Sequence, residues 1–445
     1  MGKITLRQAA AWCGGRIDEK YADVEFFGAN NDSRKITKGQ LFVALQGARD
    51  GHDFVEKAME NGAAAVLCTK SVGDIPSILV EDSRIALGQI AKAERQRLGM
   101  KVVGVTGSVG KSTTKEMIAC VLESTYKVAK TPANHNNDIG MPMAVLAIPE
   151  GTEVAVLEMG MNHFREIAYL TDIAKPDVGV IINIGTMHIE HLGSQQGILK
   201  AKLEITEGMG ADGKLILNGD DTLLWGAKEK TGVTTATFGW KNPQCDVYGT
   251  NITLGETVSF DTDFGRICLP LEGEHYVADA LAAVSVGLEM GVSKEKIRES
   301  LGAFRNLAGR QEILKVKECT VIKDCYNAGP ESMAAALRVL ATKPARRIAV
   351  LGDMLELGIN AEAEHYRIGR IAAECADVVL AYGPNASRVI SGCITGGMPD
   401  TVAMAFDDRE KLAALLLRVA RPGDTLLFKG SHGMHMELVL EMFMK

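Results

Sequence analysis

The stretch Lys101–Met117, KVVGVTGSVGKSTTKEM, decides the fold, because a short apolar run passes through a glycine turn straight into a helix-forming segment. The turn and the first helical residues are Gly107, Ser108, Val109, Gly110, Lys111, Ser112 and Thr113. Backbone N–H groups at such a turn, with a helix dipole behind them, form a cradle for an anion. The spacing is T-G-x-x-G-K-S, since Val105 stands where the standard loop has its first glycine. We predict nucleotide phosphate binding rather than an ordinary glycine turn, with Lys111 on the outer phosphates and Ser112 on Mg²⁺.

The segments after this loop predict a parallel sheet. Two further apolar runs, TEVAVLEMG (152–160) and PDVGVIINIG (176–185), are separated by helical stretches, as expected for buried strands with crossover helices. Glu158 ends the first run and His188 follows the second. Carboxyl ends of parallel strands line the ligand crevice of an open sheet, so both side chains are expected to face the phosphate loop. We assign residues 100–308 to a central P-loop α/β domain with a mostly parallel sheet.

Two more domains flank the central one, because 445 residues are too many for one compact core. Three apolar runs near the C-terminus each end in glycine and precede a helical pattern: RRIAVLG (346–352), ADVVLAYG (376–383) and DTLLFKG (424–430). They predict a Rossmann-like, doubly wound domain over residues 309–445. Residues 1–99, with shorter strand-like runs and helices, are expected to form a separate α/β domain. The fold class is therefore α/β with three domains.

Composition excludes several functions. The net charge is −7 and no long basic run occurs, which disfavours nucleic-acid binding. The nine cysteines show no C-x-x-C pair, so they are expected to be thiols in a reducing cytoplasm. The start MGKITLRQAA lacks an apolar signal core, and no apolar run is long enough to span a bilayer. We therefore expect a cytoplasmic protein without membrane insertion, and a monomer.

Several segments carry a resemblance to a known family: the phosphate loop, TPANHNNDIGMP (131–142), VLEMGMNHFREI (156–167), DCYNAGPESM (324–333) and LGDMLELG (351–358). They resemble the Mur ligases, which share a three-domain fold with folylpolyglutamate synthetase and form amides through an acyl phosphate. The resemblance implies an ATP-dependent ligase that uses Mg²⁺. Within the family it points to the addition of D-alanyl-D-alanine to UDP-N-acetylmuramoyl-tripeptide, in peptidoglycan precursor synthesis.

The resemblance also implies a metal site. In Mur ligases the positions that match Glu158 and His188 bind a second magnesium ion, together with a carbamylated lysine that ILKAKLEI (198–205) places at Lys202. A carbamate would turn this cation into an oxygen-rich anion, which suits a hard metal. The residues alone leave other readings open. Glu158 could cap a helix, and neither His191 nor Lys200 is distinguished from its neighbour without the family match.

Further binding residues follow from the resemblance. Ser33 and Arg34, in NDSRKITKGQLFVALQGARDGHDF (31–54), would contact the uridine diphosphate. The muramyl-peptide and the γ-phosphate would meet the polar rim of Asn134, Asn136 and Asn137. In the last domain, Arg310 of G-R-x-E would touch ATP, and Asp324 and Asn327 would hold its ribose side. Lys429 and Ser431, after the last strand, would orient the incoming amine or the acyl phosphate. ATP would then bridge two domains, so the last domain is expected to close as a lid.

Some features depart from the family, and two alternatives stay open. Tyr276 and Asp279, in GEHYVAD (273–279), replace two asparagines of the adenine-side segment, so no adenine contact is predicted. His432 stands where the family usually has arginine. One alternative is a related ligase that adds a different amine, although its D-N-P-R motif is absent here. The other is a P-loop ATPase or regulator that performs no ligation.

Overall fold

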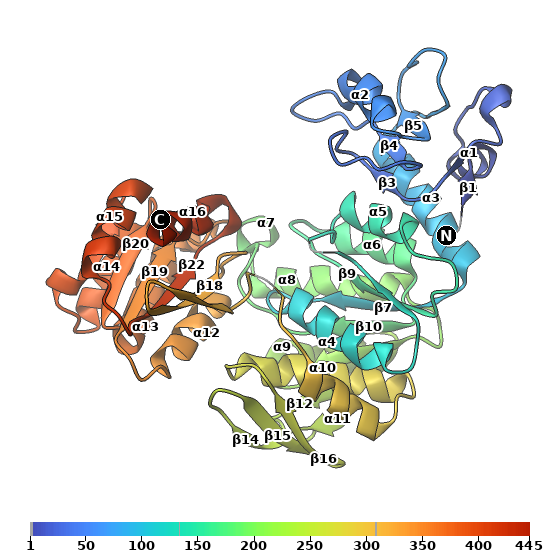
Figure 1. Cartoon of the computed structure of the whole chain (residues 1–445). Helices are drawn as coiled ribbons and strands as arrows, with labels where there is room; N and C mark the ends of the chain where they lie inside the picture. The colour runs from blue at the N-terminus through green and yellow to red at the C-terminus, as the bar shows by residue number, and fades with distance from the viewer. Residues whose placement is uncertain (1–2, 133, 308) are drawn as a thin grey trace.

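The computed structural model describes residues 3–132, 134–307 and 309–445. Ala308, the last residue expected for the central domain, lies outside this part. The chain forms three lobes in an arc (Figure 1). The N-terminal lobe contains a parallel sheet within residues 29–79, the central lobe a sheet within residues 101–248, and the C-terminal lobe a sheet within residues 312–429. Among the described helices, none has both the length and the apolar character needed to cross a membrane.

The central lobe is built on a seven-stranded parallel sheet. Its strand order is β13 (Val247–Tyr248), β12 (Thr234–Gly239), β11 (Lys214–Asn218), β10 (Val178–Ile181), β7 (Lys101–Thr106), β9 (Val154–Glu158) and β8 (Val128–Lys130). The chain adds β8 and β9 on one side of β7 and β10 on the other, so β7 lies at a topological switch point. Loops after β7, β9 and β10 therefore diverge from one crevice, the position at which open α/β sheets bind ligands.

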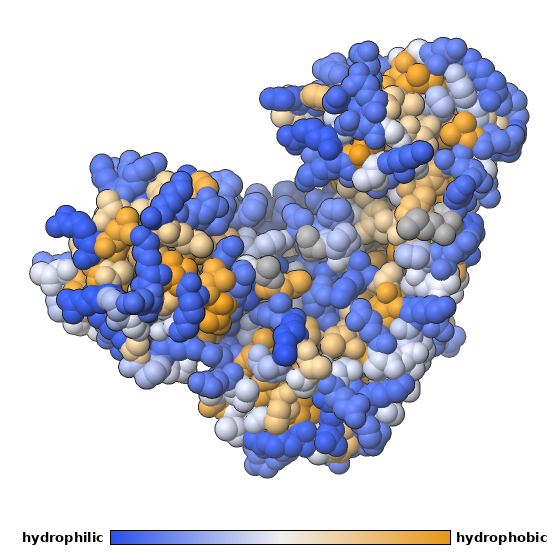
Figure 2. Space-filling view, viewed as in Figure 1, coloured by the Kyte–Doolittle hydropathy of each residue, from blue (hydrophilic) through white to orange (hydrophobic). Residues whose placement is uncertain are grey.

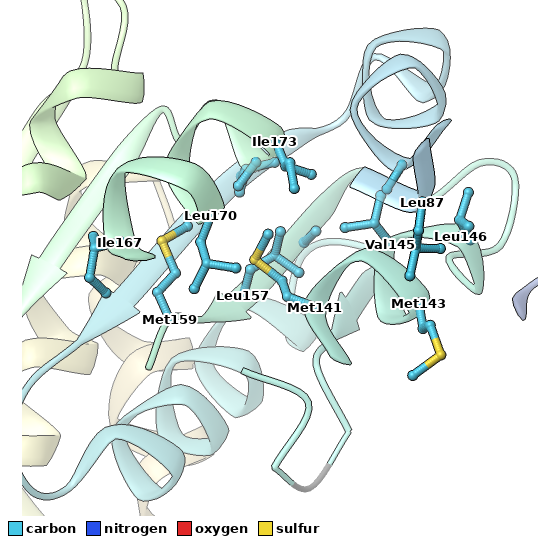
Figure 3. Close-up of a cluster of buried hydrophobic side chains, with 14 of the residues drawn as sticks. Leu87, Met141, Met143, Val145, Leu146, Leu157, Met159, Ile167, Leu170 and Ile173 are labelled. Carbon is cyan, nitrogen blue, oxygen red and sulfur yellow. The ribbon is translucent and has the colours of Figure 1, made fainter. Parts of the chain in front are cut away.

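Helices cover both faces of this sheet, which explains its continuous apolar strands. One face packs on α4 (Lys111–Glu123), α10 (His275–Glu289) and α11 (Lys294–Ala303). The other packs on α5 (Gly140–Leu146), α6 (Glu166–Ala174), α8 (Gln195–Leu203) and α3 (Ser83–Leu98). Figure 3 shows this second core, where Leu157 of β9 lies among Met141, Leu170 and Ile173. The short helices α7 (Ile189–Leu192) and α9 (Thr222–Ala227) follow β10 and β11.

The N-terminal lobe shares a core with the central lobe through α3. Leu87 of this helix lies beside Val145 and Leu146 of α5 (Figure 3). The lobe itself contains the parallel sheet β3 (Ala29–Asn30), β4 (Leu41–Val43), β5 (Ala65–Cys68) and β6 (Ser77–Leu79), the antiparallel pair β1 (Ile4–Thr5) and β2 (Glu25–Phe26), and helices α1 (Leu6–Cys13) and α2 (Val55–Glu60). The shared core connects the N-terminal lobe to the central sheet on the face of α5 and α6.

A small antiparallel sheet was not anticipated from the sequence. It consists of β14 (Thr250–Thr253), β15 (Val258–Thr262) and β16 (Gly265–Leu269), and its apolar residues join the core under α10 and α11. The strands alternate buried and exposed positions only partly, because Val258, Ser259 and Phe260 are all buried. That run breaks the two-residue period by which a half-exposed strand is identified in a sequence.

The C-terminal lobe has the predicted doubly wound form. Its sheet runs β17 (Glu312–Val316), β18 (Cys319–Asp324), β22 (Thr425–Lys429), β19 (Arg347–Gly352), β20 (Val378–Tyr382) and β21 (Ala403–Phe406), with only β17 antiparallel among these strands. Helices α12 (Pro330–Ala341), α13 (Ala361–Cys375) and α14 (Ala386–Thr395) cover one face, and α15 (Arg409–Val419) and α16 (Met436–Met444) the other. The carboxyl ends of β18 and β22 lie side by side, which brings Asp324 next to Lys429.

Candidate active site

The phosphate loop is held by a residue that the sequence analysis did not single out. Asn183, in the loop after β10, accepts hydrogen bonds at its Oδ1 from the backbone N–H groups of Ser108 and Val109, each at 3.0 Å. Its Nδ2 donates back to the Val109 carbonyl at 3.0 Å. Gly110 then caps α4 with a left-handed φ of 85°. The only sequence signal for Asn183 was a polar residue directly after a buried strand.

Lys111 and Ser112 both lie where the loop meets the cleft. The Lys111 Nζ donates to the carbonyls of Gly107, at 2.9 Å, and Ser108, at 3.3 Å. Burial lowers the pKa of Lys111, and the charge of Glu158 partly opposes this shift. The Ser112 hydroxyl donates to Glu158 Oε2 at 2.8 Å. Among the residues that the structure describes, the loop lysine thus binds only backbone carbonyls, from which a more negative ligand can draw it away.

Glu158 is almost fully buried and tied to the asparagine-rich segment. Its side chain ends β9 at 2% exposure, and its Oε1 accepts from Asn136 Nδ2 at 2.8 Å. Its backbone N–H donates to Thr131 Oγ1 at 3.0 Å. Asn137 has a different task, since its Oδ1 accepts from the Gly140 N–H at 2.7 Å at the start of α5. The predicted proximity of Glu158 to the phosphate loop is present in the structure.

A cavity of about 640 Å³ lies between the central and C-terminal lobes. Figure 2 shows a hollow there, with a mostly hydrophilic surface. Most of the predicted site residues line this cavity: Ser108, Val109, Gly110, Lys111, Ser112, Thr113, Asn134, Asn136, Asn137, Glu158, His188, Arg310, Asp324, Asn327, Lys429 and Ser431. Gly107, Lys202, Ser33 and Arg34 are not among the lining residues. One cleft therefore collects groups from two lobes.

The C-terminal lobe extends two basic groups into the cavity. Arg310 Nη2 donates to Ser112 Oγ at 2.8 Å, and its guanidinium lies 4.1 Å from the centre of the Tyr326 ring. Lys429 Nζ donates to Asp324 Oδ2 at 2.7 Å and to the Asn327 carbonyl at 3.0 Å, in a nearly buried pair. A nucleotide in the cavity would face positive charge from both sides.

Ser431 supports the backbone around this pair. Its hydroxyl donates to the Ala328 carbonyl at 3.0 Å and accepts from the Leu355 N–H at 2.9 Å. Both partners belong to loops that line the cavity, on DCYNAGPES and LGDMLELG. Ser431 thus links two of the segments that carry the family resemblance.

Lys202 is a buried amine next to the phosphate loop. Its side chain is 2% exposed on α8, and within the described residues it makes no ion pair or hydrogen bond. Burial, and next the charge of Lys111, lower the pKa of Lys202 well below its usual range. A neutral amine is the form that reacts with carbon dioxide to give a carbamate. The environment of Lys202 therefore favours the chemistry that the resemblance implied.

Of the candidate metal ligands, Ser112, Glu158 and His188 line the cavity, whereas Lys202 does not. His188, with φ 64°, places its Nδ1 2.6 Å from Glu356 Oε2 in the C-terminal lobe. Within the described residues, no three His, Cys, Asp or Glu side chains are grouped as metal ligands. The paired oxygens of Ser112 and Glu158 do fit Mg²⁺, which prefers a few hard oxygen ligands and brings the rest as water and phosphate.

Tyr276 and Asp279, which replace the two asparagines of the family segment, lie in the wall of the cavity, and His432 also lines it. Asp279, on α10, accepts a hydrogen bond at 2.8 Å from Thr114 Oγ1, and burial raises its pKa to about 7. The Tyr276 hydroxyl accepts from Asn306 Nδ2 at 2.8 Å, and burial raises the pKa of this phenol as well. Burial lowers the pKa of their half-buried neighbour His275 to about 4. Between about pH 4 and pH 7 the Asp279 carboxyl, the Tyr276 phenol and the His275 imidazole are therefore mostly uncharged.

Ser33 and Arg34 lie in the N-terminal lobe and do not line the cavity. Arg34 is exposed and pairs with Asp32 through Nη2 and Oδ2 at 2.8 Å. Ser33 is buried, and its carbonyl accepts from Asn61 Nδ2 at 2.8 Å. The Arg34 guanidinium is therefore presented at the surface by a short ion pair, where a phosphate could replace the carboxylate.

The phosphate loop lies at the switch point of a parallel sheet, and a doubly wound domain adds Arg310 to the same cleft. These features define a three-domain P-loop protein. Family models match most of the chain: "Mur ligase family, catalytic domain" over residues 27–95, "Mur ligase middle domain" over 105–287 and "Mur ligase, glutamate ligase domain" over 309–432. The chain belongs to the Mur ligase family, which confirms the resemblance and the predicted fold class.

Individual relatives are similar over their whole length. The chain is 39% identical to a UDP-N-acetylmuramoyl-tripeptide–D-alanyl-D-alanine ligase of Bacillus subtilis, with 99% of this chain and 98% of the relative covered. Its structure matches MurF from Acinetobacter baumannii with a TM-score of 0.91 at 32% identity, covering 100% and 99% of the two chains. MurF from Thermotoga maritima in complex with ADP matches with a TM-score of 0.81 at 30% identity, covering 94% and 97%.

Proposed function

We propose that this protein is an ATP-dependent ligase that joins D-alanyl-D-alanine to UDP-N-acetylmuramoyl-tripeptide, a step of peptidoglycan precursor synthesis. The names of its full-length relatives support this substrate pair. The observation that carries the proposal is the cleft in which Lys111 and Ser112 of the central lobe meet Arg310 of the C-terminal lobe. An ATP molecule there would have its phosphates on one lobe and its ribose beside Asp324 on the other.

The reaction needs an activated carboxylate. The terminal carboxylate of the tripeptide attacks the γ-phosphorus of ATP, which forms an acyl phosphate and releases ADP. The amine of D-alanyl-D-alanine then attacks the acyl carbon, and inorganic phosphate leaves with the C–O bond electrons. Both steps depend on positioning and on neutralising phosphate charge. The loop N–H groups from Gly107 to Thr113, the Lys111 ammonium and the Arg310 guanidinium are suited to that task.

Magnesium is part of the proposal. Ser112 and Glu158 would hold one ion, and Glu158, His188 and carbamylated Lys202 would hold a second. Bound there, Mg²⁺ would neutralise the charge that builds up on the transferred phosphoryl group. The buried amine of Lys202 supports this assignment, because it has lost the solvation that would keep it protonated. Glu158 would exchange its hydrogen bond with Ser112 for a metal contact.

The remaining predicted residues would each bind a different part of the substrates. Ser33 and Arg34 would hold the uridine diphosphate on the N-terminal lobe. The muramyl-peptide would extend from there to the rim of Asn134, Asn136 and Asn137, which lines the cavity. Asn327 would contact the nucleotide with Asp324, and Lys429 and Ser431 would orient the amine or the acyl phosphate.

The organisation of the chain is also proposed. We assign the domains to residues 1–99, 100–308 and 309–445, and we expect a cytoplasmic monomer that binds neither nucleic acid nor membrane. The net charge of −7 supports the absence of a nucleic-acid partner. The single connection at Gly309 and Arg310 supports a C-terminal domain that closes over ATP. Scattering curves that are identical with and without ATP would contradict this closure.

Mass spectrometry of the reaction products tests the function. The protein is incubated with ATP, with UDP-muramyl-tripeptide ending in lysine or diaminopimelate, and with D-alanyl-D-alanine or single amino acids. We expect the UDP-muramyl-pentapeptide and one phosphate per amide bond, and no product from Lys111→Ala. Phosphate release that is independent of the acceptor peptides would indicate a non-ligating ATPase. A product with a different amine would indicate a related ligase.

A further inference from the structure

One short segment of the central lobe is attached to the C-terminal lobe residue by residue. The interdomain segment, Gly185–Leu192, follows β10 and carries His188 to the cavity. Its first residue is bound to the central lobe itself, because the Gly185 N–H donates to Ser108 Oγ of the phosphate loop at 2.9 Å. The next three residues, Thr186, Met187 and His188, all contact the opposite lobe.

Glu331 holds the first of these residues. It is the second residue of α12, and its Oε1 accepts from both the N–H of Thr186, at 2.9 Å, and the Thr186 hydroxyl, at 3.0 Å. The contact is close, since a Cβ placed on Gly185 would lie 2.8 Å from Glu331 Cδ. A carboxylate that accepts a backbone N–H and a hydroxyl on one oxygen fixes the peptide plane as well as the side chain.

Glu356 holds the last of them. Its Oε2 lies 2.6 Å from His188 Nδ1, and both residues adopt a left-handed backbone, with φ of 62° and 64°. For residues with a side chain this conformation is unfavourable and persists where surrounding contacts impose it. Leu355, beside Glu356, is itself fixed by the hydrogen bond of its N–H to Ser431. The strained loop of one lobe thus meets the strained turn of the other.

Close packing between the two lobes supports the contacts that Glu331 and Glu356 make. Gly329 leaves room for Met187, because a Cβ at position 329 would lie 2.6 Å from Met187 Cγ. Gly358 likewise faces Glu190, with a hypothetical Cβ 3.0 Å from its Cβ. Two glycines on the C-terminal lobe therefore provide the close approach that the two glutamates need.

We propose that Glu331 and Glu356 are positioning residues that couple the seating of the C-terminal lobe to the placement of Thr186 and His188 at the phosphate loop. When the lobe turns away at Gly309, both carboxylates leave with it. The interdomain segment then keeps its anchor at Gly185 and loses those at Thr186 and His188. The proposal goes beyond the ligase function, because it concerns the ordering of a segment in the protein without substrate.

Hydrogen exchange of the full-length protein tests this coupling. In Glu331→Ala and Glu356→Ala, we expect the amides of the interdomain segment to exchange about three- to tenfold faster than in the wild type, because their anchors are lost. Glu331→Gln should behave like the wild type, since its amide oxygen still accepts from Thr186. Glu362→Ala is the matched control: Glu362 is an exposed glutamate of the same lobe that pairs with Arg388.

Several outcomes decide the question. Wild-type exchange rates in both alanine variants, with β7 peptides as an internal reference, would overturn the proposal. If an alanine variant does not fold, Glu331→Met or Glu356→Met, which keeps the length of the side chain and removes the acceptor oxygens, takes its place with the same expected acceleration. Where ligation is active, the turnover number should fall about tenfold in the alanine variants while the Kd for ADP stays within about twofold. The exchange result stands even if the proposed ligase activity is not found.

Discussion

Arg310 and Ser112 are 198 positions apart in the sequence, yet Arg310 Nη2 donates to Ser112 Oγ at 2.8 Å. The same hydroxyl donates to Glu158 at 2.8 Å, so one serine joins a cation of the C-terminal lobe to a buried anion of the central lobe. A phosphate loop usually offers this hydroxyl to a metal ion. Arg310 therefore adds positive charge beside Glu158.

Replacing Arg310 should impair catalysis more than folding. Arg310→Ala removes a charge beside the phosphate site, and we expect the turnover number to fall about 100-fold, as for other transition-state donors. Arg310→Lys should recover part of the rate, because it keeps the charge and loses the planar contact with Tyr326. Steady-state ligation kinetics measure both. Arg305 is an exposed arginine in the same connection, so the turnover number of Arg305→Ala should stay near that of the wild type. An equal loss in this variant would mean that a disturbed connection, and not the missing charge of Arg310, causes the effect.

The amine of Lys202 should be indispensable. Lys202→Met keeps the volume of the buried side chain and removes the group that can form a carbamate, so ligation should fall at least about 100-fold and bicarbonate should not restore it. Carbon-13 NMR with labelled bicarbonate should show a carbamate signal in the wild type and in Lys200→Met, whose exposed lysine lies on the same helix. Full activity of Lys202→Met would exclude the carbamate role.

Asp279 should make stability depend on pH. Burial raises the pKa of Asp279 to about 7 from 3.8, so between these values the folded protein holds a proton that the unfolded chain has released. This contribution to stability is complete below about pH 4 and is lost as the pH rises through about 7. Asp279→Asn keeps the acceptor for Thr114 without the charge. The free energy of unfolding of this variant should therefore exceed that of the wild type by up to roughly 4 kcal/mol at pH 8, and by progressively less toward pH 4.

Urea unfolding of both proteins at several pH values measures this difference. The exposed Asp263, which pairs with Lys294 at the surface, provides the control variant Asp263→Asn. Its stability relative to the wild type should show little change over the same range, because an exposed ion pair contributes little. If the difference in the free energy of unfolding between Asp279→Asn and the wild type does not vary with pH, a raised pKa of Asp279 is excluded.

The parts of the fold that local sequence determines could be predicted. The apolar strand and glycine turn before Lys111 identify β7, the loop and α4, because each depends on residues a few positions apart. Glu158 could be placed near the loop from its position at a strand end, since parallel strands share one carboxyl edge. The buried amine of Lys202 could not, because α8 also carries Lys200, and burial depends on which face packs against the sheet.

Specific contacts between residues far apart in the sequence could not be predicted. Asn183 was missed because an asparagine after a strand usually indicates a turn, and only the structure shows it bonded to Ser108 and Val109. Glu331 and Glu356 lay in recognised segments without an assigned task. Their partners, Thr186 and His188, are more than 140 positions away and become neighbours only when the C-terminal lobe closes.

The space under the phosphate loop can be tested by adding one methyl group. Gly99 and Gly110 both have left-handed backbones, with φ of 65° and 85°, so alanine at either position should cost about 1–2 kcal/mol. At Gly99 nothing lies within 4 Å of the new Cβ, whereas at Gly110 it would lie 2.8 Å from Asp279 Oδ1. Gly110→Ala should therefore lose about 1–3 kcal/mol more in urea unfolding, and about tenfold or more in ADP affinity by calorimetry. Equal losses of stability in the two variants would mean that Asp279 can retreat, and that the buried carboxylate does not fix the loop.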